Sequence, residues 1–89
     1  MSGASTDVLR RRVIEIVCQS AEGDLSEADL VEAGGSLPAV GYSSLATIRM
    51  IDAIENELGV YLEPEDSRLR TVDGILASVA EATSDAVPA

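Results

Sequence analysis

The sequence predicts an all-α fold, a small bundle of four helices in which the first connection is long and the third helix is short. Three stretches of the chain place apolar residues three and four positions apart, the spacing of a helix that buries one face. The 89 residues include two tyrosines and neither phenylalanine nor tryptophan, so the core must be built from Leu, Ile, Val and Ala. A chain of this length supports one small core, which suits such a bundle.

The first helix is predicted over residues 7–21, with Thr6 as its cap and Asp7 near the positive end of the helix dipole. Residues 1–6 are small and polar, and we expect them to be flexible. One face of the helix should enter the core. It is formed by Leu9, Val13, Ile16, Val17 and Ser20.

Residues 22–43 lose this periodicity and contain several glycines and a proline, which predicts a long loop. A short helical turn is expected within it, around residues 26–33. Five apolar residues should hold the loop against the bundle: Leu25, Leu30, Val31, Leu37 and Val40. A loop of this length in a compact domain usually serves a function.

The second long helix is predicted to begin at Ser44 and end near Leu58, where Gly59 can adopt the left-handed conformation that stops a helix. Its core face should contain Thr47, Met50, Ile51, Ile54 and Leu58. Leu45, and to a smaller extent Ile48, lies outside that face. Leu45 in particular lies beside polar residues, which indicates either a docking surface or a side chain that covers the preceding loop.

A short third helix is expected after a connector, with Pro64 in its first turn. The last helix should begin at Thr71 and bury Val72, Ile75, Leu76 and Val79. We therefore expect one domain over residues 7–82, followed by a flexible tail over residues 83–89.

The composition disfavours several classes of function. Sixteen acidic and six basic residues give a net charge of −10, which repels nucleic acid and anionic membrane surfaces and attracts partners rich in Arg and Lys. The chain has no histidine and a single cysteine, Cys18, which disfavours an ordinary zinc site, a Ser-His catalytic pair and an internal disulfide. The start of the chain lacks a basic and apolar leader. We expect a cytoplasmic monomer that is not an enzyme and binds neither nucleic acid nor membranes.

Ser44 has two interpretations at this stage. Serine is among the best helix caps, and replacing a capping serine by alanine typically costs about 1 kcal/mol. The same oxygen could instead carry a phosphate ester, because an anion at an exposed helix N-terminus gains roughly 0.3–1 kcal/mol from the helix dipole.

The stretch "VGYSSLATIRMIDAIENELGVYLEPED" resembles the acyl and peptidyl carrier proteins, in which a Gly-x-(Asp or His)-Ser-Leu motif opens the second helix. The residues that fit in register are Gly41, Ser44, Leu45, Ile54, Glu55, Leu58, Gly59 and Val60. The resemblance extends over residues 9–82 and implies a four-helix bundle of the acyl-carrier type.

The resemblance also implies that a phosphopantetheinyl transferase attaches 4'-phosphopantetheine from coenzyme A to Ser44. The thiol of this arm would hold an acyl or aminoacyl group as a thioester for loading and downstream biosynthetic enzymes of polyketide or nonribosomal peptide pathways. The residues implied to contact such partners are Tyr42, Leu45, Ile48, Arg49 and Asp52. Tyr42 could instead anchor the loop, with its hydroxyl group in water.

Two positions depart from the family pattern. Ser43 stands where Asp or His is usual, which leaves open which transferase accepts the chain and makes Ser43 a rival acceptor. Arg49 stands where fatty-acid carriers tend to be acidic, which favours an aminoacyl cargo, whereas the acidic composition favours an acyl one. The alternative function is an unmodified acidic helical module that binds other proteins, with Ser44 as a cap only. The segment "EGDLSEADLVEAGG" does not place its oxygens in the register of a calcium-binding loop.

Overall fold

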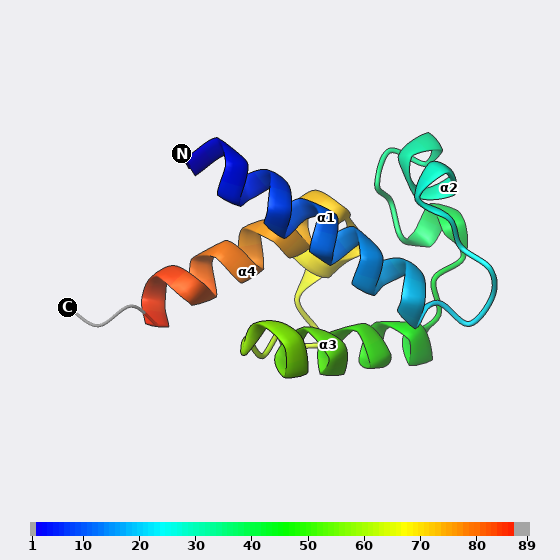
Figure 1. The fold of residues 1–89 in the computed structure, drawn as a ribbon. Coiled ribbons are helices and arrows are strands. Elements are labelled where there is room, and N and C mark those ends of the chain that lie inside the picture. Colours follow the sequence, from blue (N-terminus) through cyan, green and yellow to red (C-terminus); the bar gives the residue numbers. More distant parts are fainter. Residues whose placement is uncertain (1, 87–89) are drawn as a thin grey trace.

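The computed structural model describes residues 2–86, with side chains over residues 7–83, and it confirms the all-α prediction (Figure 1). Within these residues, four α-helices follow one another: α1 (Ser2–Ser20), α2 (Glu27–Glu32), α3 (Ser44–Leu58) and α4 (Val72–Ala86). Two short 3-10 helices, η1 (Pro38–Val40) and η2 (Ser67–Arg70), lie in the connections. None of the helices within the described residues is long and apolar enough to cross a membrane.

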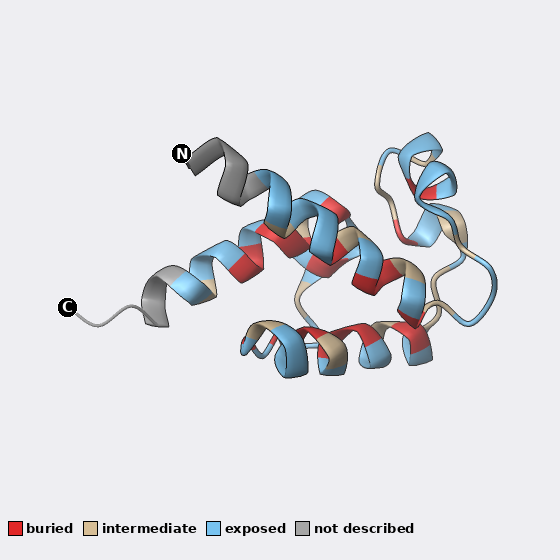
Figure 2. Ribbon diagram, viewed as in Figure 1, coloured by how far each residue is buried: buried red, intermediate tan, exposed pale blue. Residues whose placement is uncertain are grey.

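The core lies between α1, α3 and α4, whose buried positions face inward in Figure 2. Helix α1 packs against both α3 and α4, and η2 packs against α4. The α2 segment lies at one end of the molecule, beyond this packed unit (Figure 1). The predicted core faces of the long helices are confirmed. The largest fully buried side chains are Ile16, Leu30, Met50, Ile54, Ile75, Val13, Val17 and Val79.

Helix α1 begins at Ser2 rather than at Asp7, so the prediction that Thr6 caps it is wrong. No proline interrupts residues 2–6, and the single glycine there costs a helix only about 1 kcal/mol. At the other end of the chain, α4 continues to Ala86. Met1 and residues 87–89 of the predicted flexible termini lie outside the described residues.

Two arginines of α1 connect it to its neighbours. Arg10 forms an ion pair with Asp73 of α4, with 3.0 Å between nitrogen and oxygen. Arg12 pairs with Glu57 of α3. These side chains are partly exposed, so each pair adds at most about 1 kcal/mol to the free energy of unfolding. The main effect of the pairs is to orient the helices.

The long loop forms the short helix that the sequence predicts. Ser26 and Asp29 exchange side-chain and backbone hydrogen bonds in a capping box that starts α2. Leu30 and Leu37 are buried and hold the loop in place, as predicted. Val31 is 66% exposed, so its predicted packing role is wrong, because a helix as short as α2 can turn only one of two successive residues toward the core.

The end of this loop is paired with the segment that leads into α4. Leu37 N–H donates to the carbonyl of Arg70 at 2.8 Å, and Val72 N–H donates to the carbonyl of Gly35 at 3.0 Å. An isolated antiparallel bridge joins Ser36 to Thr71 between them. The loop that precedes α3 is therefore held beside η2.

The predicted short third helix is present as η2, but Pro64 lies in a turn that precedes it rather than in its first turn. The carboxylate of Asp66 accepts a hydrogen bond from Arg68 N–H at 2.9 Å, which caps the helix after the proline. Helix α4 then begins at Val72, and the hydroxyl of Thr71 accepts from Gly74 N–H at 2.9 Å. Thr71 is thus a cap rather than the first helical residue.

Candidate functional site

The first turn of α3 is capped by Ser43, so the interpretation of Ser44 as the cap is wrong. Ser43 has extended backbone dihedrals (φ −85°, ψ 168°), as expected for a cap, and its hydroxyl accepts from Ala46 N–H at 3.0 Å. Its carbonyl accepts from the hydroxyl of Thr47 at 3.1 Å. The hydroxyl and carbonyl of Ser43 are both engaged in starting the helix.

Ser44 is the first residue of α3, and its side chain is exposed. Its hydroxyl makes no hydrogen bond to any of the residues 7–83 whose side chains the structure describes. The group lies at the positive end of a helix that is 15 residues long. It is therefore an accessible hydroxyl in an environment that favours an attached anion.

Tyr42 leads the chain into this turn and anchors it to α1. Its hydroxyl donates to the carbonyl of Val17 at 2.8 Å, so the alternative that placed this hydroxyl in water is wrong. Burial raises the pKa of Tyr42 to about 12, despite an opposing contribution from Ser20. The anchor fixes the position of the two serines that follow.

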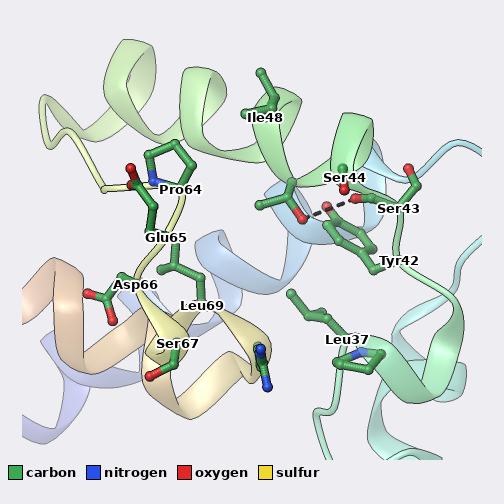
Figure 3. A pocket seen from close by; sticks show the side chains of 13 residues that line it. Leu37, Tyr42, Ser43, Ser44, Ile48, Pro64, Glu65, Asp66, Ser67 and Leu69 are labelled. Carbon is green, nitrogen blue, oxygen red and sulfur yellow. Dashed lines mark hydrogen bonds between the residues drawn. The ribbon is translucent and has the colours of Figure 1, made fainter.

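A pocket of about 430 Å³ opens beside Ser44 (Figure 3). One wall comes from the first turns of α3, a second from the end of the long loop, and a third from the segment around η2. The lining residues are Leu37, Pro38, Tyr42, Ser43, Ser44, Thr47, Ile48, Pro64, Glu65, Asp66, Ser67, Leu69 and Arg70. Figure 3 shows Leu37 and Leu69 reaching toward the space from the walls opposite Ser44 and Ile48. A group attached to Ser44 has this pocket within its immediate surroundings.

The charged residues that line the pocket differ in whether they form ion pairs. Asp66 is bound by Arg68, whose guanidinium approaches it at 3.0 Å. That hydrogen bonding holds the pKa of Asp66 below its usual value. Arg70 is the one basic residue among those that line the pocket. It forms no ion pair with a carboxylate of residues 7–83.

Four of the five predicted partner-contact residues lie exposed on α3 close to Ser44. Leu45 and Ile48 are 48% and 51% exposed, and they are two of five large apolar side chains within residues 7–83 that are exposed. Arg49 and Asp52 are exposed on the same helix. Tyr42, in contrast, is half-buried and contributes to the pocket wall.

The sequence analysis did not identify the far walls of the pocket. Leu69 and Arg70 are distant from Ser44 in the chain and come near it only because the loop before α3 pairs with the start of α4. No local pattern signals such pairing. The one indication in the sequence was the pair of glycines Gly34 and Gly35. Both adopt positive φ angles at the turn that precedes the paired segment.

Cys18 is half-buried at the edge of the core, and burial together with Glu27 and Asp29 raises its thiol pKa. Among the described residues, no group of three or more His, Cys, Asp or Glu side chains is arranged to hold a metal ion.

Comparison of the chain with family models, curated proteins and solved structures gave no match.

Proposed function

We propose that this protein carries an acyl or aminoacyl group as a thioester on a 4'-phosphopantetheine arm attached to Ser44. The observation that supports the proposal most directly is the difference between two adjacent serines. Ser43 uses its hydroxyl to cap α3, whereas the hydroxyl of Ser44 is exposed and makes no hydrogen bond within residues 7–83. The second hydroxyl is thus available for modification without loss of the cap.

The surroundings of Ser44 fit a phosphate ester. In the proposed reaction, the hydroxyl oxygen attacks the phosphorus of coenzyme A that bears the pantetheine group. A new oxygen–phosphorus bond forms, the bond to the second phosphate breaks, adenosine 3',5'-bisphosphate leaves, and the transferase accepts the hydroxyl proton. The resulting phosphodiester lies at the N-terminus of α3, where an anion gains roughly 0.3–1 kcal/mol. This chain supplies the acceptor and its position, and the transferase supplies the catalysis.

The surface around the attachment point suits contact with enzymes that act on the arm. Leu45 and Ile48 present exposed apolar surface within the first turns of α3, and Arg49 and Asp52 add charges of both signs beside them. Side chains of this kind form the centre and rim of ordinary protein interfaces. We place the loading enzyme and the downstream enzymes, of a polyketide or nonribosomal peptide pathway, on this face in turn.

The test is an intact-mass measurement after incubation with coenzyme A and a broad-specificity phosphopantetheinyl transferase. We expect a mass increase of one phosphopantetheinyl group in the wild-type protein and none in Ser44→Ala. An unchanged wild-type mass with several transferases would contradict the proposal and favour an unmodified module that binds other proteins through the same face.

A further inference from the structure

Arg70 holds a distinctive position in the pocket beside Ser44. Its backbone carbonyl accepts the hydrogen bond from Leu37 N–H, so the two residues are fixed next to each other where the loop meets η2. Its side chain is exposed and lines the pocket together with Leu37 and Leu69, which are almost fully buried. A guanidinium group therefore stands beside apolar surface within one pocket.

Two carboxylates line the pocket together with Arg70, those of Glu65 and Asp66, and neither forms an ion pair with it. Asp66, in the same pocket, is engaged by Arg68 through its Nε and terminal nitrogen atoms. Glu81 also contacts Arg68. Other arginines pair across the fold, Arg10 with Asp73 and Arg12 with Glu57, whereas Arg70 has no such partner among the carboxylates of residues 7–83.

An arginine beside apolar side chains would favour some acyl groups on the arm at Ser44 over others. Leu37, Leu69 and Ile48 can cover an aliphatic chain, which gains free energy by leaving water. A guanidinium binds a carboxylate through a planar pair of N–H donors. In a chain with a net charge of −10, an anionic group would otherwise be disfavoured near the surface.

We propose that Arg70 is a specificity-determining residue that retains acyl groups ending in a carboxylate within the pocket, in preference to plain alkyl groups. This inference rests on the proposed function, because the cargo reaches the pocket from an arm on Ser44. The aliphatic part of the cargo lies against Leu37 and Leu69, and its carboxylate pairs with the guanidinium of Arg70.

The experiment compares two cargoes of equal chain length, adipoyl, which ends in a carboxylate, and hexanoyl, which ends in a methyl group. Each is loaded onto Ser44 by a transferase from its coenzyme A thioester. The rate of thioester cleavage by hydroxylamine is then measured, relative to the free acyl-pantetheine. We expect the adipoyl group to be protected roughly two- to fivefold more than the hexanoyl group, since a partly exposed ion pair contributes about 0.4–1 kcal/mol.

The variants separate Arg70 from a general effect of charge. In Arg70→Gln, which keeps the backbone contact to Leu37, the difference between the two cargoes should disappear. In Arg11→Gln, which removes an exposed arginine of α1 that lies outside both the pocket and the partner-contact residues, the difference should persist. Circular dichroism checks that both variants remain folded.

Equal protection of the two cargoes in the loaded wild-type protein, or a difference that survives Arg70→Gln, would overturn the inference and leave the proposed function intact. Absence of any loading at Ser44 is a different result, because it contradicts the proposed function and this inference with it.

Discussion

Ser43 and Ser44 have the same side chain, and the backbone decides what each can do. Ser43 is extended and turns its hydroxyl back onto Ala46 N–H, whereas Ser44 is helical and leaves its hydroxyl exposed. The sequence predicted that α3 begins at Ser44 but offered Ser44 itself as the cap, because helix ends are uncertain by about one or two residues. If α3 began one residue later, Ser44 would be the cap and the hydroxyl of Ser43 would be free.

The stability of two matched variants tests this assignment. Ser43→Ala should lower the free energy of unfolding by about 1 kcal/mol, because it removes the acceptor of Ala46 N–H. Ser44→Ala should change it by less than about 0.5 kcal/mol, as is usual for an exposed side chain without a partner. Urea denaturation measures both values. A larger loss of stability in Ser44→Ala than in Ser43→Ala would show that Ser44 is the cap.

Tyr42 provides a test based on pH. In a Tyr61→Phe variant, the absorbance change of the remaining phenol should report a pKa of about 12, raised by burial from the ordinary value of 10.0. Since the folded state favours the neutral phenol, its contribution to stability is complete below about pH 10 and is lost as the pH rises toward about 12.

A titration of that variant with the ordinary midpoint would show that the phenol of Tyr42 is not buried against α1. The double variant that also carries Tyr42→Phe is the control, since it has no phenol left to titrate.

The contact between η2 and α4 depends on one glycine within a helix. A Cβ atom at Gly74 would lie 1.9 Å from the carbonyl oxygen of Arg68, which is part of the backbone and cannot move aside by itself. A glycine inside a helical pattern can indicate such a close approach, and the sequence therefore contained a signal that the periodicity analysis did not use.

Gly74→Ala should therefore destabilise the protein by about 1–3 kcal/mol, the usual cost of overpacking, although alanine favours helices more than glycine does. Thermal denaturation gives the change. Gly23→Ala is the matched control, because nothing lies within 4 Å of a Cβ there and little effect is expected. Equal stability of Gly74→Ala and Gly23→Ala would mean that η2 does not pack closely against α4 at Gly74.

The exposed face of α3 gives a prediction about partners. Leu45→Ala and Ile48→Ala remove side chains that are about half exposed, so helix content should stay the same while loading by a partner enzyme slows. Stopped-flow or gel-based loading kinetics measure the effect. Val31→Ala, at an even more exposed apolar residue on α2, should leave the rate unchanged. Unchanged kinetics in all three variants would remove Leu45 and Ile48 from the proposed interface.

The elements that the sequence predicted well are those fixed by local periodicity. The faces of α1, α3 and α4 follow from apolar spacing, and Gly59 ends α3 in the left-handed conformation as expected (φ 71°). The pocket was not predictable in this way, because its walls meet through the backbone bonds of Gly35 and Leu37 to residues far along the chain. Pairing of this kind depends on the whole fold.

At the scale of the molecule, the buried core and the proposed attachment point lie in different parts of the structure. The buried residues lie between α1, α3 and α4 (Figure 2). Ser44, in contrast, is exposed and is the first residue of α3. Tyr42 and the cap at Ser43 fix that point to the core. In the proposed function, an arm attached at Ser44 would therefore have a fixed anchor.

The most direct test of this account is to locate the attached group after reaction with coenzyme A and a transferase. Fragmentation of the peptide that contains both serines distinguishes the two oxygens. We predict phosphopantetheine on Ser44 alone, in the wild-type protein and in the folded fraction of Ser43→Ala. A group found on Ser43, or a peptide that stays unmodified with every transferase tried, would contradict the central claim.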